Sequence, residues 1–280
     1  MYRKGFIDRY LKNGFEFDES VSEVDFALDV LFGFSYKDFM LGKTLEKWQI
    51  TKYQKVLEER LSTRKPIQQI VGQAYFWNKK FFVNEHTLIP RPETEILVQE
   101  TLALAKEFEY PQILDIGSGS GCIPITLVME NKNITAESVD ISVDALEIAR
   151  KNSLFHNVHD KVNFYISDVF EKVNGQYDII VSNPPYIPLS DKDTLAVEVR
   201  DFDPYNALFT KDEKGIEFYE RISVEAKKYL SGYLVFEIGI NQSELVQNLL
   251  KANGYEDIRV INDYNLIPRI IISRYNFNKT

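Results

Sequence analysis

The sequence predicts an α/β fold, in which a mostly parallel, seven-stranded sheet with helices on both faces follows a small helical domain. Three observations lead to this prediction. Apolar residues recur at helical spacing over the first 70 positions, an aromatic and β-branched stretch follows, and from position 111 strand-like and helix-like segments alternate. Because such alternation is typical of parallel sheets, we expect a helical domain at 1–70, a hairpin linker at 71–90 and an α/β domain at 91–280.

In the first region, apolar side chains three and four positions apart predict packed helices. They include Val24, Leu28, Leu31 and Phe32, and then Tyr53, Val56, Leu57 and Leu61. Gly33, Gly42 and Pro66 interrupt these runs. Two interpretations stay open: an ordinary small helical bundle, or a domain that docks a macromolecular substrate. The first 60 residues contain ten basic and eleven acidic side chains, so this segment lacks the positive charge of a nucleic-acid-binding domain.

The second region contains seven strand candidates, at 113–116, 134–140, 162–166, 177–182, 233–238, 255–261 and 269–273. Helices are expected at 93–108, 122–130, 142–152, 215–230 and 243–253. No helix fits between the last two strands, so we expect the final strand to run antiparallel to its neighbours.

Composition and charge restrict the class of protein. Of 280 residues, 33 are Lys or Arg and 42 are Asp or Glu, which gives a formal net charge of −9 and disfavours binding to a duplex. The single cysteine, Cys122, cannot form an intramolecular disulfide, and the three histidines show no metal-ligand spacing and are expected at the surface. Charges interrupt the N-terminus and no apolar run is long enough to cross a membrane. We expect a cytoplasmic protein without a signal peptide or a metal.

A glycine-rich loop, Asp115-Ile116-Gly117-Ser118-Gly119-Ser120-Gly121, follows the first strand and opens a helix. Glycines let the backbone turn sharply and approach a ligand closely. Asp140 ends the second strand, where an acidic group typically binds ribose hydroxyls. A dinucleotide fingerprint would need a third glycine at 122, which is Cys. The acidic residue at 115 instead suits a ligand with an amino group and a cationic centre, as in S-adenosylmethionine.

Ser167-Asp168 ends the third strand, at the same edge of the sheet. The carboxylate of Asp168 could accept a hydrogen bond from an adenine amino group, with Val169 or Phe170 beside the ring. It could equally be the N-cap of a helix.

The tetrapeptide Asn183-Pro184-Pro185-Tyr186 ends the fourth strand. The prolines lack backbone donors, so the Pro184 carbonyl and the Asn183 side-chain carbonyl form a pair of acceptors suited to an NH2 group. Tyr186 offers a flat face to a planar group. Two acceptors would draw the lone pair of a poor nitrogen nucleophile toward a methyl sulfonium, and no strong general base is required. The alternative is a rigid Pro-Pro turn.

These motifs together resemble the bacterial release-factor glutamine methyltransferases of the PrmC/HemK type. The most discriminating match is Leu88-Ile89-Pro90-Arg91-Pro92-Glu93-Thr94-Glu95, and further matches are Glu237-Ile238-Gly239 with Gln242 and the pair Pro268-Arg269. The resemblance covers nearly the whole chain from the hairpin onward, and it departs conservatively at Ser118 and at Asp203-Pro204.

The resemblance implies a class I, Rossmann-like methyltransferase domain that uses S-adenosylmethionine to methylate the side-chain nitrogen of a glutamine. That glutamine would lie in the Gly-Gly-Gln loop of class I peptide chain release factors. Gly117, Ser118, Gly119, Ser120, Gly121, Asp140, Asp168, Val169 and Asn183 would bind the cofactor. Asn183, Pro184, Pro185 and Tyr186 would hold the glutamine, and of these Asn183, Pro184 and Tyr186 would be catalytic. The expected protein is a monomer that binds neither nucleic acid nor membrane.

Two alternatives remain at this point. Enzymes that methylate exocyclic amines of nucleic acids, such as N6 of adenine, also present loops like Asn183–Tyr186, although the acidic charge and the non-basic first domain weigh against that class. A scaffold that binds the cofactor without catalysis would require the Asn183 arrangement to be vestigial.

Overall fold

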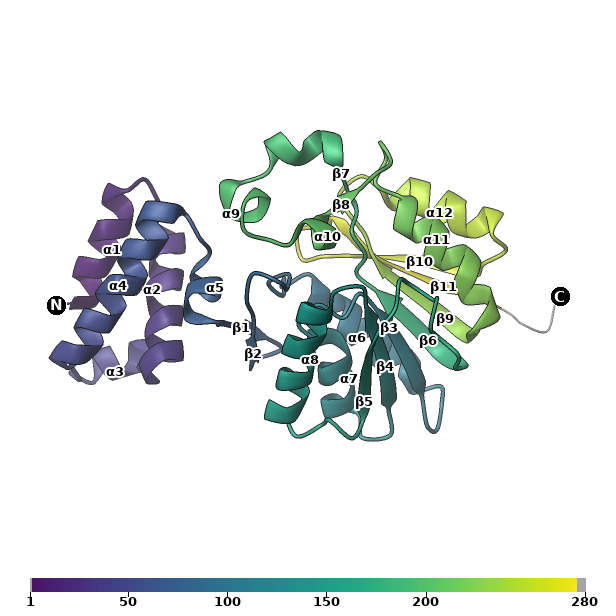
Figure 1. The fold of residues 1–280 in the computed structure, drawn as a ribbon, viewed down its shortest axis with the longest axis horizontal. Coiled ribbons are helices and arrows are strands. Elements are labelled where there is room, and N and C mark those ends of the chain that lie inside the picture. Colours follow the sequence, from purple (N-terminus) through teal and green to yellow (C-terminus); the bar gives the residue numbers. More distant parts are fainter. Residues whose placement is uncertain (1, 276–280) are drawn as a thin grey trace. The chain divides into compact units, whose positions relative to one another are not determined.

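The computed structural model describes residues 2–275, which divide into two compact units (Figure 1). The first contains the chain up to Ala74 together with Ala196–Phe202, a segment that the sequence analysis places in the second domain. The second contains Tyr75–Leu195 and the chain from Asp203 onward. No helix within residues 2–275 is both long and apolar enough to cross a membrane.

The first unit is helical, as its sequence spacing predicts. It is built from α1 (Tyr2–Lys12), α2 (Phe17–Phe32), α3 (Tyr36–Met40), α4 (Lys47–Thr63) and α5 (Ile67–Val71), with α9 (Val197–Arg200) from the later segment. Its core includes Val24, Leu28, Tyr53 and Leu57, four of the eight side chains that the sequence singles out. Gly33 ends α2 with a left-handed conformation, in which glycine meets no steric penalty.

A buried arginine joins the later segment to the helices of this unit. The Arg60 guanidinium is almost fully buried, and it donates to Glu23 at 2.8 Å and to Glu198 of α9 at 3.1 Å. Gln69 also donates from Nε2 to the backbone oxygen of Phe202, at 2.9 Å. A buried charge is tolerated only when it is paired and hydrogen-bonded, so these contacts hold Ala196–Phe202 on the helical unit.

The second unit contains a seven-stranded sheet in the order β10-β11-β9-β6-β3-β4-β5. The strands are β3 (Gln112–Ile116), β4 (Thr135–Asp140), β5 (Val162–Ile166), β6 (Tyr177–Ser182), β9 (Leu230–Glu237), β10 (Glu256–Asn262) and β11 (Pro268–Arg274). All seven predicted strands are present. β11 pairs antiparallel with both β9 and β10, which confirms the reversed final strand.

Helices cover both faces of this sheet (Figure 1). One face packs against α6 (Thr94–Ala105), α7 (Cys122–Glu130) and α8 (Val143–Phe155), and the other against α11 (Glu217–Glu225) and α12 (Ser243–Ala252). Successive residues of a strand point to opposite faces, so Ile113 and Ile179 belong to the first core while Leu114 and Ile180 belong to the second.

The chain reverses direction across the sheet between β3 and β6. β4 and β5 lie on one side of β3, whereas β6, the next strand in sequence, pairs with the other side. Ligands of open α/β sheets bind beyond the carboxyl ends of the strands at such a switch point. The glycine-rich loop follows β3 and the Asn183–Tyr186 motif follows β6, so both motifs flank this point.

Two regions of short elements complete the unit. β1 (Gln73–Phe76) and β2 (Lys79–Phe82) form the expected hairpin, with Trp77 and Asn78 at positive φ between them. After the Asn183–Tyr186 motif come β7 (Ile187–Pro188), the 3-10 helix η1 (Leu189–Thr194), α10 (Tyr205–Leu208) and β8 (Phe209–Thr210). The sequence predicts no element here, because none of these segments is long enough to show a hydrophobic period. A second 3-10 turn, η2 (Ala226–Lys228), follows α11, so the helix predicted at 215–230 is shorter and broken.

Candidate functional site

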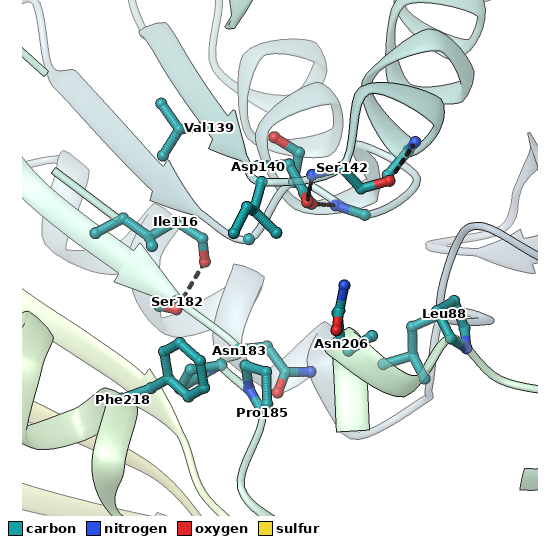
Figure 2. A pocket seen from close by; sticks show the side chains of 18 of the residues that line it. Leu88, Ile116, Val139, Asp140, Ser142, Ser182, Asn183, Pro185, Asn206 and Phe218 are labelled. Atoms are coloured by element: carbon teal, nitrogen blue, oxygen red, sulfur yellow. Dashed lines mark hydrogen bonds between the residues drawn. The ribbon is translucent and has the colours of Figure 1, made fainter. Parts of the chain in front are cut away.

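A cavity of about 610 Å³ lies at the carboxyl ends of the parallel strands, within the second unit. This volume is in the range of small-molecule sites. Figure 2 shows Asp140 and Ser142 on one side of it and Asn183 and Pro185 on the opposite side. Of the predicted site residues, the following line the cavity: Gly117, Ser118, Gly119, Ser120, Asp140, Asp168, Val169, Asn183, Pro184 and Pro185.

The glycine-rich loop is tied to the end of β4 by its backbone. The amide nitrogens of Gly117 and Ser118 both donate to the Val139 carbonyl, at 2.8 and 3.0 Å. Gly117 has a φ of +91°, and a side chain there would stand 3.8 Å from the Asn183 carbonyl oxygen. A glycine therefore gives the loop its turn and leaves the backbone open to the cavity.

Asp140 organises the same loop through its carboxylate. Oδ2 accepts a hydrogen bond from the Gly119 amide and Oδ1 accepts one from the Ser142 amide, both at 2.9 Å. Burial raises the pKa of this carboxyl above its ordinary value, although the hydrogen bonds from Ser142 and Gly119 oppose the shift. Each carboxylate oxygen has a second acceptor direction, so Asp140 retains the capacity to bind a pair of hydroxyl groups.

Asp168 is paired with an arginine that the sequence analysis does not identify. Arg221 of α11 donates from Nη1 to Oδ1 of Asp168 at 2.6 Å and from Nη2 to the Asp168 backbone oxygen at 3.2 Å. Both residues line the cavity. The ion pair fixes the carboxylate beside Val169 and leaves Oδ2 as an acceptor at the cavity wall.

Asn183 lies directly after β6 and is anchored through its amide. Nδ2 donates to Oγ1 of Thr94, at 3.4 Å, and Thr94 in turn donates to Oε2 of Glu237 at 2.7 Å. Before it in the chain, Ser182 Oγ donates to the Ile116 carbonyl at 2.7 Å, which joins the ends of β6 and β3. The side chains of Asn183, Pro184 and Pro185 thus form one wall of the cavity.

A glutamine clamps the other end of this motif. Gln242 donates from Nε2 to the Tyr186 carbonyl at 2.9 Å, and its Oε1 accepts from the Gly239 amide at 3.0 Å. A side chain on Gly239 would come within 2.8 Å of the Tyr186 ring, and one on Gly215 would collide with the Tyr186 carbonyl oxygen. These contacts explain why Gly239 and Gln242 accompany the Asn183–Tyr186 motif in the sequence.

Three expected contacts are absent from the cavity wall. Gly121 serves packing instead, because a side chain there would meet Ile125 at 3.0 Å and Ala149 at 3.1 Å. Tyr186 is half-buried and packs against the second core, so its role against a substrate stays a prediction. Asp115 is fully buried behind the loop, where Ser138 donates to its Oδ2 at 2.6 Å. Burial raises the pKa of Asp115 to about 8, which does not suit the cation contact expected from the sequence.

A wall of the cavity comes from residues that the sequence analysis leaves unassigned. It is formed by Pro204, Tyr205, Asn206, Ala207, Phe209, Thr210 and Lys211. In the view of Figure 2, Asn206 appears between Asn183 and Leu88. Arg91 donates to the buried Asp203 at 2.6 Å, which holds the start of this wall against the loop that contains Leu88. In the sequence, the one local indication of this wall is the Asp203-Pro204 pair, which belongs to the family resemblance.

The expected surface position of one histidine needs correction. His156 is half-buried, not at the surface: its Nε2 lies 2.9 Å from the Lys80 carbonyl and burial lowers its pKa. Cys122 lines the cavity, and burial raises the pKa of its thiol to about 12, so it is present as an unreactive thiol.

Several known proteins that are similar to this chain in sequence or in fold are named as methyltransferases. Residues 92–199 match the family model described as methyltransferase small domain. A release factor glutamine methyltransferase from Fusobacterium nucleatum is 39% identical over 240 residues, which is 84% of this chain and 67% of that protein. One from Chlorobaculum tepidum is 39% identical over 233 residues, which is 79% of this chain and 78% of that protein.

The fold is also similar to that of a solved methyltransferase from Pyrococcus furiosus. The TM-score is 0.53 at 15% identity, over 81% of this chain and 98% of the other. At that identity the similarity concerns the fold, and it agrees with the seven-stranded architecture.

Proposed function

The chain belongs to the release factor glutamine methyltransferase family, and on that premise we propose that it methylates the Gln side-chain nitrogen (N5) in the Gly-Gly-Gln loop of class I release factors. The methyl donor is S-adenosylmethionine. The observation that carries the proposal is the position of Asn183 on the cavity that the glycine-rich loop and Asp140 also line.

The residues of the cavity fit the cofactor. Gly117 and Gly119 have positive φ and place backbone against the cavity, where side chains would take space. Asp140, which already binds the Gly119 amide, would accept hydrogen bonds from the ribose hydroxyls, and Asp168, fixed by Arg221, would accept one from the adenine amino group. When bound, the cofactor supplies an electrophilic methyl group on a sulfonium sulfur.

The chain's own residues supply positioning for the acceptor. An amide nitrogen is a poor nucleophile because its lone pair is delocalised into the carbonyl. In the proposed mechanism, Asn183 Oδ1 and the Pro184 carbonyl accept hydrogen bonds from the two hydrogens of the substrate NH2 group. This arrangement aligns the nitrogen with the methyl group and favours localisation of its lone pair. Alignment of this kind is worth up to about 7–11 kcal/mol.

We favour a protein substrate over a nucleic acid. The net charge of −9 supports this choice, since strong binding to a phosphate backbone needs a basic surface. We also propose that the enzyme acts as a monomer in the cytoplasm.

The proposal is tested with labelled cofactor and three acceptors: a class I release factor, its Gln→Ala variant in the Gly-Gly-Gln loop, and a duplex oligonucleotide. Label on the unmodified release factor alone is expected. Equal label on the Gln→Ala variant, or label on the oligonucleotide, would contradict it.

A further inference from the structure

Glu237 lies at the end of β9, next to the cavity but not in its wall. Its side chain is 3% exposed, and its Oε2 accepts the hydrogen bond from the Thr94 hydroxyl at 2.7 Å. Tyr219 Oη donates to the Glu237 backbone oxygen at 3.1 Å, which fixes the end of the strand. A carboxylate buried so deeply is costly, and Thr94 is the neighbour that connects it to the cavity.

The hydrogen-bonding capacity of these groups determines how the Asn183 amide is turned. A hydroxyl has one proton, and when Glu237 is ionised, above its pKa of about 7, Thr94 gives its proton to the carboxylate. The Thr94 oxygen can then only accept, so the atom of Asn183 that faces it must be the NH2 group, which lies 3.4 Å away. Burial raises the pKa of Glu237 to about 7, and hydrogen bonding from Thr94 and Asn183 opposes this rise, so the Asn183 NH2 group also faces the carboxylate and all three side chains lie together.

We propose that Glu237, acting through the Thr94 hydroxyl, is a positioning residue that orients the Asn183 amide. The NH2 group of Asn183 then faces Thr94, and its oxygen faces the nitrogen that receives the methyl group. This inference rests on the proposed function, because it is that function which requires an acceptor at Asn183 Oδ1. Without the carboxylate, the Asn183 amide could flip. Its NH2 group would then face the NH2 group of the substrate, and neither group can accept a hydrogen bond from the other.

The chemistry predicts different outcomes for substitutions that are nearly equal in shape. Thr94→Val removes the hydroxyl, and Thr94→Ser keeps it. Glu237→Gln can donate to Thr94, which releases the Thr94 proton to bond the Asn183 oxygen and favours the wrong orientation. Thr101→Val is a matched control, because Thr101 is a buried threonine on the same helix whose hydroxyl bonds only the Leu97 carbonyl, at 2.7 Å.

The experiment measures kcat on a release factor and the Kd for S-adenosylmethionine by calorimetry at pH 8, where Glu237 is ionised, for the wild type and these four variants. We expect kcat to fall about 10- to 100-fold in Thr94→Val and Glu237→Gln, with cofactor Kd within about threefold. Thr94→Ser and Thr101→Val should keep kcat within about threefold of the wild type.

The two proposals fail in different ways. A wild-type enzyme that does not methylate the glutamine overturns the proposed function. If the wild type is active, the positioning role is overturned when Thr94→Val or Glu237→Gln keeps kcat, or when Thr94→Ser loses as much as Thr94→Val. Where Thr94→Val proves unstable, the comparison of Glu237→Gln with wild type and with Thr101→Val decides the question alone.

Discussion

The Gly119 amide donates a 2.9 Å hydrogen bond to Oδ2 of Asp140, so the loop after β3 and the acid after β4 form one rigid edge of the cavity. Neighbouring strands in a parallel sheet bring their carboxyl ends together, and β3 pairs with β4 along the whole length of β3. The Asp140 carboxylate thus shapes the loop and also faces the cavity.

Asp140→Ala should weaken the binding of S-adenosylmethionine by about 10- to 100-fold, since hydrogen bonds to a charged group are worth about 1.5–3 kcal/mol. Calorimetric titration measures this directly. Asp160→Ala, which removes an exposed carboxyl outside the cavity wall, is the control and should leave Kd unchanged. An unaltered Kd in Asp140→Ala would remove Asp140 from the cofactor site.

Asn183→Ala should lower kcat by about 10²- to 10³-fold, the loss typical when one hydrogen-bonding group that stabilises the transition state is removed. The cofactor Kd should change far less, because the acceptor matters chiefly in the transition state. Steady-state kinetics at saturating cofactor check this split. An equal loss in affinity and in kcat would mean that Asn183 mainly binds the cofactor.

Two glycines of the same loop should respond differently to alanine. A side chain at Gly121 would lie 3.0–3.2 Å from Ile125, Ala149 and Phe164, so Gly121→Ala should destabilise the fold by about 1–3 kcal/mol. Gly119 has no neighbour within 4 Å and lines the cavity, so Gly119→Ala should mainly weaken cofactor binding. Thermal melting and calorimetry compare the two variants. The reverse order of effects would be inconsistent with the packing role of Gly121.

Stability should depend on pH through Glu237. Burial raises the pKa of this carboxyl from 4.5 to about 7, so the folded state keeps a proton that the unfolded state releases. Its contribution to stability is therefore full below about 4.5 and falls as pH rises to about 7. Glu237→Gln should melt a few degrees above the wild type at pH 8 and show no such gain at pH 5.

The groups around Glu237 support this assignment. Glu93 raises its pKa and Arg269 lowers it. The nearby phenol of Tyr186 and thiol of Cys122 have pKa values raised to about 12, so they stay neutral across this range. The Tyr219 phenol has a pKa raised well above its ordinary value by burial. A gain in melting temperature that is the same at both pH values would show that titration of Glu237 is not its cause.

In the helical unit, Arg60→Met should cost about 3–5 kcal/mol, because removal of one partner leaves Glu23 and Glu198 without their buried counter-ion. Arg64→Met is the matched control. Arg64 also pairs with Glu198, at 2.7 Å, but its side chain is 40% exposed, and exposed pairs contribute about 0–1 kcal/mol. Denaturant titration of the full chain measures both, and equal losses would contradict the special role of the buried arginine.

The sheet could be predicted from the sequence because each strand carries its own signal. The strands predicted at 162–166 and 177–182 match β5 and β6 at both ends, and β11 lies reversed as the short connection required. The main positions of the cavity also follow from local motifs, since residues directly after parallel strands share one edge of the sheet.

The rest depended on contacts between distant parts of the chain. In the sequence, Arg221 has the pattern of an ordinary helix residue and Thr94 that of a helix start. Only the fold shows that Arg221 donates to Asp168 and that Thr94 donates to Glu237. The wall that contains Asn206 has elements of two to four residues, too short for a periodic pattern. The charge of Asp115 predicts a contact with the ligand, whereas its burial is visible only in three dimensions.

The most direct test of the proposed function is a mass spectrum of the Gly-Gly-Gln peptide from a release factor incubated with S-adenosylmethionine and this protein. One added methyl group on the glutamine side chain is expected with the wild type and almost none with Asn183→Ala. A peptide of unchanged mass with folded, cofactor-bound wild type, or the same yield with Asn183→Ala, would contradict it.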